Sequence, residues 1–197
     1  LVSGPYEVGG IAPMGAAYLF VTDRTIDTVG ELSGKSIAVL EYDSAQASMA
    51  SRVGMSPVMS DITNFSGRFN NGSVDICFAP IAAYSALELY KGMQPDGGMI
   101  DYVLGQLTAQ VILKKDKFPD GYADKSRKYM LGQFDRAMTV IENANNEVDK
   151  KWWIRIPEAD KLRYDEMMRE ARIALTKDGV YSKEMMSLLR KVRCKEE

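Results

Sequence analysis

The stretch KSIAVLEYDSAQASMASRVGMSPVM, residues 35–59, decides the fold class. Its first six residues, 35–40, predict a strand that is buried on both faces. Asp43 or Ser44 can cap a helix after this strand, and Gly54 stands where a helix commonly ends. Residues 57–59 then predict a second, short strand. A strand, a helix and a strand in this order indicate an α/β fold with a mainly parallel sheet.

Strands and helices alternate on both sides of this stretch. Apolar, β-branched and aromatic runs bounded by turn residues predict the strands, and helical spacing of apolar residues predicts the helices. Further strands are expected at residues 17–22, 74–79, 99–104 and 108–113. One helix is expected after Asp61, and another is expected to begin at Pro80.

Three parts of the chain differ in character. Residues 1–16 are rich in Gly, Pro and Ala and predict a loop or connecting segment. Residues 17–113 form the predicted α/β lobe. Residues 114–197 have long helical periodicity, with one stripe from Met130 to Ile141, and predict a helical region that packs on the lobe.

Composition excludes several classes of function. The chain has 197 residues, of which 46% are hydrophobic and 26% charged, and a formal net charge of -2. This charge does not suggest a nucleic-acid partner. No apolar run reaches the ~18–20 residues that span a bilayer, so this chain is not by itself a channel or pump.

The chain has no histidine and two cysteines. This excludes a Ser-His-Asp triad, a Cys-His dyad, His-ligated zinc and a four-thiolate metal site, so neither a metal nor a cofactor is expected. Cys77 lies in a predicted buried strand, and its simplest interpretation is a small core residue. A bridge between Cys77 and Cys194 is not indicated by the sequence.

Several short motifs then resemble one family in the right order and spacing. Residues 31–39 (ELSGKSIAV) resemble the "DL+GLKIRV" segment of DctP-like solute-binding proteins of TRAP transporters, which have the type II periplasmic binding fold. Residues 53–58 are similar to the "LGANPV" of the family, residues 69–75 to "LQTGVVDG", Pro80 to the proline of "ENP", and residues 114–121 to "K+FW+sLP".

The resemblance implies a periplasmic protein, not an enzyme, that binds a small molecule between two α/β lobes and delivers it to a membrane transporter. It implies that residues 17–113 are the second, ligand-binding lobe and that most of the first lobe has no counterpart. Three ligand-contacting positions depart from the family. Ala38 and Ala79 stand where the family has Arg and Asn, and Tyr18 aligns loosely with a second Arg, so tight binding of a simple dicarboxylate is not expected.

Aromatic, acidic and amide side chains surround the expected cleft, and they suit a cationic or polyhydroxylated ligand. Several have simpler interpretations: Tyr18 and Phe78 as core residues, Asp43 as a helix cap, and Asp75 as a turn or cap residue. The adjacent Trp152 and Trp153 predict a helix end packed on the sheet or, as the alternative, an interlobe surface. The candidate ligand-binding residues are Tyr18, Glu41, Tyr42, Asp43, Gln46, Phe78, Tyr84 and Gln106.

Alternative functions remain open from the sequence. Some proteins that the chain resembles are labelled as components of resistance-nodulation-division efflux pumps linked to aminoglycoside resistance, which is compatible with an accessory periplasmic role. A second alternative is a scaffold or interaction module that has lost its ligand. A lone lobe would expose an apolar face and could form a homodimer. An enzyme is the weakest hypothesis, because no spacing specifies a catalytic site.

Overall fold

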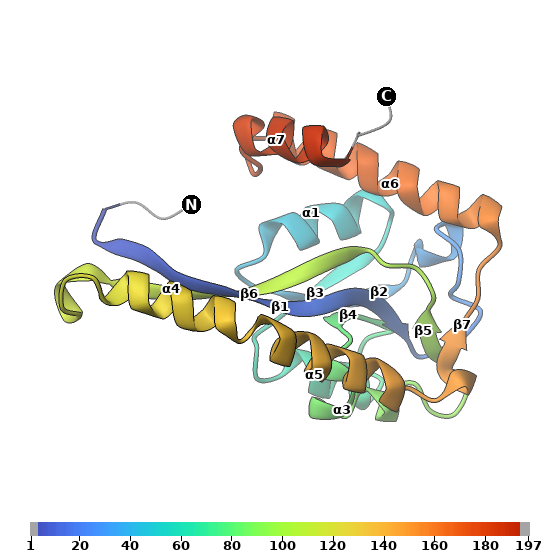
Figure 1. Ribbon diagram of the computed structural model, residues 1–197. Helices are drawn as coiled ribbons and strands as arrows, with labels where there is room; N and C mark the ends of the chain where they lie inside the picture. Colours follow the sequence, from blue (N-terminus) through green and yellow to red (C-terminus); the bar gives the residue numbers. More distant parts are fainter. Residues whose placement is uncertain (1–3, 194–197) are drawn as a thin grey trace.

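A computed structural model describes residues 4–193 and contains one seven-stranded sheet flanked by helices (Figure 1). The strands are β1 (Tyr6–Val21), β2 (Ser36–Leu40), β3 (Ser56–Ser60), β4 (Ile76–Pro80), β5 (Gly98–Ile100), β6 (Gly105–Lys114) and β7 (Trp153–Ile154). The α-helices are α1 (Ser44–Arg52), α2 (Phe65–Asn70), α3 (Ala83–Ala86), α4 (Tyr122–Gly132), α5 (Phe134–Glu147), α6 (Glu158–Lys177) and α7 (Lys183–Arg193). Four 3-10 turns join them: η1 (Gly30–Leu32), η2 (Leu89–Lys91), η3 (Lys115–Lys117) and η4 (Lys150–Trp152).

The α/β class is confirmed, but the sheet is mixed rather than mainly parallel. Its order is β3-β2-β4-β1-β5-β7, and β6 pairs with β1 outside this path. The pairs β2–β3, β2–β4 and β5–β7 are parallel. The long β1 lies in the middle and runs antiparallel to β4, β5 and β6. The alternation of strands and helices predicted the parallel part, but it could not reveal where β1 inserts.

The central β2–α1–β3 unit forms as its sequence predicts. Asp43 caps α1, because its Oδ1 accepts the Gln46 N–H at 2.9 Å. Gly54 follows the helix with φ +80°, a conformation that suits glycine. Asp75, just before β4, accepts the Ser36 N–H at 2.8 Å and the Ser36 hydroxyl at 2.7 Å. Asp75 therefore has a structural role, but it joins the starts of β2 and β4 rather than capping a helix or a turn.

Helices cover both faces of the sheet and enclose two cores. The face under α1 and α6 is packed by residues such as Leu19, Val39, Ala50 and Tyr164. The opposite face lies against α2, α3 and α5, and its core includes Phe20, Phe69, Tyr84 and Trp152. Cys77 is buried in this second core, as expected, and Cys194 lies outside the described residues.

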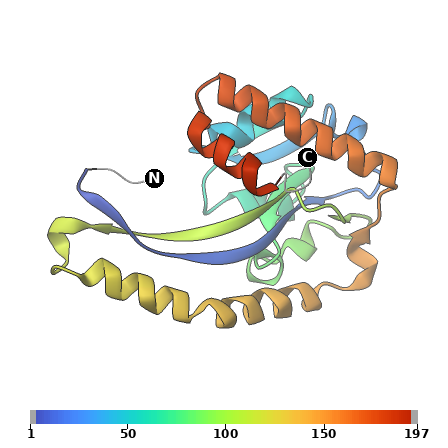
Figure 2. The same ribbon diagram turned by 45° about the horizontal axis from the view of Figure 1, so that its top comes forward.

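The loop prediction for residues 1–16 is wrong from Tyr6 onward, because β1 begins there. Residues 6–16 pair with β6 and extend beyond the rest of the sheet, with α4 packed along them (Figure 2). We call residues 6–16, β6 and α4 the arm. Glycine and proline within β1 coincide with register shifts between Val8 and Gly10 and between Pro13 and Gly15. The β-bulges at these shifts allow the strand to contain the glycine and proline residues that predicted a loop.

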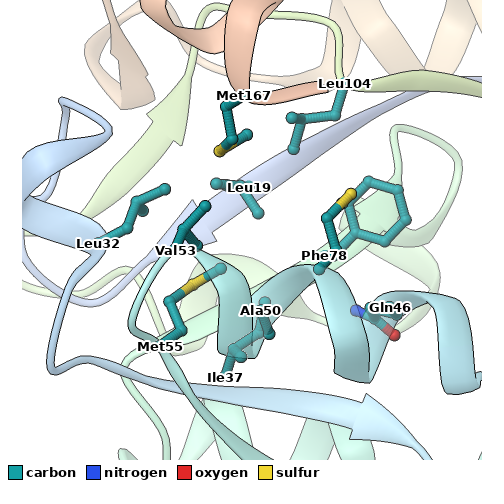
Figure 3. A pocket seen from close by; sticks show the side chains of 11 residues that line it. Leu19, Leu32, Ile37, Gln46, Ala50, Val53, Met55, Phe78, Leu104 and Met167 are labelled. Atoms are coloured by element: carbon teal, nitrogen blue, oxygen red, sulfur yellow. The ribbon is translucent and has the colours of Figure 1, made fainter. Parts of the chain in front are cut away.

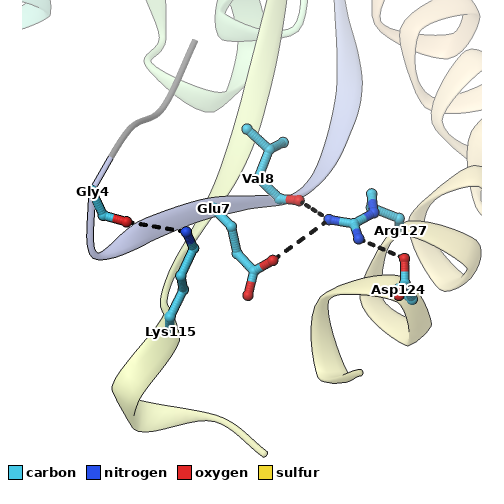
Figure 4. A network of polar contacts seen from close by, with 6 residues as sticks. All are labelled: Gly4, Glu7, Val8, Lys115, Asp124 and Arg127. Carbon is cyan, nitrogen blue, oxygen red and sulfur yellow. Dashed lines mark hydrogen bonds and ion pairs between the residues drawn. The ribbon is translucent and has the colours of Figure 1, made fainter. Parts of the chain in front are cut away.

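Polar contacts fasten α4 to the end of the arm (Figure 4). The Arg127 guanidinium donates to the Val8 carbonyl at 2.8 Å and to the Asp124 carboxylate at 2.6 Å. Its other neighbour is the Glu7 carboxylate at 4.0 Å. Lys115 donates to the Gly4 carbonyl at 3.1 Å. This bond joins the start of β1 to the end of β6 at the outer end of the arm.

The helical C-terminal third is confirmed, with local differences. The apolar stripe from Met130 to Ile141 crosses two helices, since α4 ends at Gly132 and α5 begins at Phe134. Pro80 is the last residue of β4 rather than the first of a helix. Asp61 caps a turn by accepting the Thr63 N–H at 2.7 Å, and α2 begins only at Phe65.

Candidate functional site

Residues 41–43, directly after β2, are polar, and we call them the polar edge. They lie at the carboxyl end of the parallel strands β2 and β4. Ala17 in β1 pairs with Pro80 at the end of β4, so the arm continues past this end. The Ile81 N–H, one residue further, donates to the Ala16 carbonyl at 2.9 Å. In open α/β sheets, ligands bind outside the carboxyl ends of the parallel strands. The geometry therefore places the candidate site between this edge and the arm.

Glu41, Tyr42 and Asp43 occupy this edge directly after β2. Tyr42 is 74% exposed, and Glu41 is also exposed. Backbone bonds fix the segment, because the Glu41 N–H donates to the Ser60 carbonyl at 2.9 Å and the Asp43 N–H to the Leu40 carbonyl at 2.8 Å. Asp43 also caps α1, which confirms its structural interpretation and leaves the second carboxylate oxygen directed away from that bond. The edge thus offers two carboxylates and one exposed phenol.

Gln46 and Phe78 line a small cavity under α1 and α6 (Figure 3). Gln46 is in the first turn of α1, next to the edge, since its N–H donates to Asp43. The other lining residues shown include Leu19, Met55 and Met167. The cavity is about 20 Å³ and almost entirely apolar, so it has room for about one water molecule. Binding pockets for small molecules measure ~300 Å³ or more. This cavity is therefore a packing defect of the core rather than a ligand site.

Tyr18 and Tyr84 lie on the opposite face of the sheet. Tyr18 is 8% exposed, and its ring meets Trp153 edge to face with centroids 5.2 Å apart. Burial raises the pKa of the Tyr18 phenol, and the charge of Asp101 raises it further. Tyr84 is buried beside Tyr90, and burial raises its pKa as well. Both phenols are thus neutral hydrogen-bonding groups at ordinary pH.

The three positions that depart from the resembled family come together on this face. Tyr18 is the direct cross-strand partner of Ala79, and Ala38 belongs to the same buried cluster. No guanidinium or amide stands at any of the three. The Asp101 carboxylate near Tyr18 was missed in the sequence analysis, because only the pairing of β1 with β5 brings it to this corner.

Gln106 lies apart from the other predicted residues. It is exposed at the start of β6, where it lines an open groove toward α6 and α7. The eight predicted residues therefore occupy four places: the polar edge, the apolar cavity, the aromatic face and the groove. Their convergence on one ligand remains a prediction.

The described part of the chain contains no three acidic or cysteine side chains grouped closely enough to hold a metal ion. Between residues 4 and 193, no helix has the length and apolar character needed to cross a membrane.

Solved structures identify the fold. The fold is similar to a TRAP periplasmic solute-binding protein from Desulfovibrio salexigens with bound orotic acid (TM-score 0.79, 17% identity, covering 95% of this chain and 62% of that one). It is also similar to one from Haemophilus influenzae with bound L-gulonate (TM-score 0.79, 12% identity, 95% and 63% covered). The ectoine-binding protein of the TeaABC TRAP transporter of Halomonas elongata matches with TM-score 0.72 and 13% identity, covering 95% and 62%. The fold is that of TRAP periplasmic solute-binding proteins.

Sequence comparison identifies the family within this class. All 197 residues match the model of the family described as solute-binding protein AdeT 1/2, and the chain belongs to this family. It is 44% identical over 196 residues to the probable solute-binding protein AdeT1 of Acinetobacter baumannii, and the match covers 100% of this chain and 64% of that protein. The probable solute-binding protein AdeT2 of the same organism is 25% identical over 194 residues, with 98% and 82% covered.

These matches confirm the family predicted from the motifs at residues 31–39 and 53–80. The family is described as solute-binding proteins, and the structural neighbours are named as periplasmic solute-binding proteins. The chain spans 64% of the length of AdeT1 and 62% of the D. salexigens protein.

Proposed function

We propose that this chain is the ligand-capturing lobe of a periplasmic solute-binding protein that delivers a small molecule to a membrane transporter. The observation that carries the proposal is the match of residues 1–197 to a solute-binding family, on a fold shared with ligand-bound TRAP proteins. The polar edge is the proposed contact surface. The ligand would be held there between this lobe and the first lobe that the family resemblance implies.

The chemistry of the site favours a cationic or polyhydroxylated ligand. Carboxylates of Glu41 and Asp43 stand at the edge, and the Asp101 charge lies near the Tyr18 phenol. Aromatic rings beside carboxylates attract ammonium groups and pack on the apolar faces of sugars. Ala38 and Ala79 leave these two positions without a group that could pair with a carboxylate.

An accessory role in antibiotic efflux would use the same site. A polycationic aminoglycoside carries both ammonium groups and hydroxyls, which are the groups that this proposal assigns to the ligand. The role differs only in the membrane partner, so ligand chemistry is tested first.

Isothermal titration with four probes tests the proposal: spermidine, kanamycin, gluconate and succinate. We expect saturable binding of spermidine or kanamycin and none of succinate. Glu41→Gln and Asp101→Asn remove one carboxylate each and should weaken binding by at least about fivefold, because each loses a charged contact. Glu142→Gln, on an exposed position of α5, is the matched control. Preference for succinate, or equal affinity in all variants, would contradict the assigned ligand class.

A further inference from the structure

A large groove lies between α6, α7 and the segment that leads into β6. It consists of two adjoining hollows of about 910 Å³ and 780 Å³. The two hollows share four lining residues: Leu104, Met168, Arg172 and Leu189. Pockets that hold small organic molecules measure ~300–1,000 Å³, so each hollow has room for one.

The lining combines an apolar wall with cations. Met185, Met186 and Leu188 of α7 line the second hollow, and methionine side chains adapt to ligands of irregular shape. Arg169 and Arg172 lie one turn apart on α6, which places both guanidinium groups on the groove side of the helix. Apolar surface with fixed guanidinium groups suits a molecule with a hydrocarbon body and an anionic head.

Arg172 is the cation at the junction of the two hollows. It is half-buried. Burial raises the pKa values of the Tyr102 and Tyr181 phenols, and the carboxylates of Asp165 and Asp43, respectively, raise them further, while the Arg172 charge acts on both in the opposite direction. The two tyrosines thus flank it from different elements. The Tyr102 hydroxyl already donates to Asp165, so only the Tyr181 hydroxyl is offered as a further donor for an anion. If the anionic head of a ligand binds at Arg172, its hydrocarbon body can lie against Met185 and Met186 of α7.

Carboxylates occupy the two outer parts of the groove. Asp165 accepts the hydroxyl of Tyr102, and Glu166 lines the same hollow, while Glu184 lines the other. None of the three lines both hollows. They would repel a second negative charge, so the lining favours a single anionic head over a dicarboxylate.

We propose that the groove between α6, α7 and the start of β6 binds a monoanionic amphiphile, with its head at Arg172 and Arg169 and its hydrocarbon body against the α7 methionines. This site borders the polar edge, because the Asp43 carboxylate acts on the Tyr181 phenol of the groove. It does not depend on the proposed capture of a cationic or polyhydroxylated ligand.

Titration of the whole chain with three ten-carbon probes, decanoate, decylammonium and decanol, tests the site below their micellar concentrations. We expect one decanoate per chain and at least about tenfold weaker binding of the other two. Arg172→Gln should weaken decanoate binding at least about tenfold, because the head loses its charged partner. Leu189→Asp, at a position 37% exposed, should have the same effect by placing a carboxylate in the shared wall.

Arg163→Gln is the matched control, since Arg163 lies on α6 outside the groove lining and its side chain is 69% exposed. Thermal melts establish whether each variant folds. If Arg172→Gln does not fold, the result for Leu189→Asp decides the test. Absence of saturable decanoate binding would overturn the proposal. Equal affinity for decanol, or unchanged affinity in the folded groove variants, would overturn it as well.

Discussion

Tyr18 of β1 and Trp153 of β7 meet edge to face at an interplanar angle of 84°, although β5 lies between their strands. Met99 of β5 pairs with both Phe20 and Trp153, so the rings close over the intervening strand. The contact attaches the two-residue β7, and with it the start of α6, to the centre of the sheet. It also shapes the corner where Asp101 faces the Tyr18 phenol.

Trp153→Ala should therefore destabilise the chain by about 2 kcal/mol, since it removes a half-buried indole and an aromatic pair. Trp153→Phe keeps a ring against Tyr18 and should lose less than half of this. Urea unfolding followed by circular dichroism measures both. Equal losses in the two variants would mean that the ring contact contributes nothing.

Gly97 is expected to tolerate no side chain. A Cβ at this position would lie 2.2 Å from the Val21 carbonyl oxygen and 2.7 Å from that of Met93, both backbone atoms. Gly97→Ala should cost about 3 kcal/mol, because β1 and the loop before β5 must separate. Gly105→Ala is the control, since nothing lies within 4 Å of its Cβ. Melting temperatures of the two variants decide this: a similar stability would show that the loop yields without cost.

The Cys77 thiol should be unreactive in the folded chain. Burial raises its pKa to about 12, so almost no thiolate exists at pH 8, and the side chain is shielded as well. In a Cys194→Ser variant, which leaves Cys77 as the sole thiol, labelling by iodoacetamide at pH 8 should begin only when urea unfolds the protein. Rapid labelling of the folded variant, detected by mass spectrometry, would contradict the burial of Cys77.

Asp27 should reduce stability at neutral pH. Burial raises the pKa of its carboxyl, and the neighbouring Glu31 and Asp160 raise it further. The folded chain thus binds this proton more tightly than the unfolded chain, and stability falls as pH rises through the interval between the two pKa values. Asp27→Asn should raise Tm at pH 7 and have little effect at pH 3. Glu142→Asn, on exposed α5, controls for the loss of one negative charge. A stabilisation that persists unchanged at pH 3 would exclude the electrostatic cause.

The sequence predicts the parts of the fold that local chemistry determines. Residues 35–59 contain a complete strand, cap, helix and glycine stop, and the structure confirms each. The strand at residues 6–16 was not predicted, because its glycine and proline indicate a loop unless bulges and a close-packed helix accommodate them. The mixed sheet depends on where β1 inserts, which is a long-range choice that no local pattern encodes.

In the candidate site too, some residues could be placed from the local sequence and others only from long-range strand pairing. Asp43, Glu41 and Tyr42 follow a buried strand, and the sequence alone places them at its carboxyl end. Asp101 reaches Tyr18 only through the register of β1 against β5, and Trp153 only through the pairing of β5 with β7. Contacts of this kind join segments far apart in the chain, so residue type and spacing could not indicate them.

The attachment of α4 to the arm should depend on the absence of a side chain at Gly10. A Cβ there would lie 2.4 Å from the Met130 Cγ and 2.7 Å from its Cβ. Gly10→Val should push α4 away from β1 and speed amide hydrogen exchange throughout α4, with little change in β2 and β4. Met130→Ala removes the Cγ and the atoms beyond it but keeps the Cβ, so it should restore slow exchange in part in the double variant. The two single variants and the double variant form a double-mutant cycle. A coupling energy of at least about 0.5 kcal/mol indicates direct contact between residues 10 and 130. Additive effects would mean that α4 is held chiefly by Arg127 and its partners.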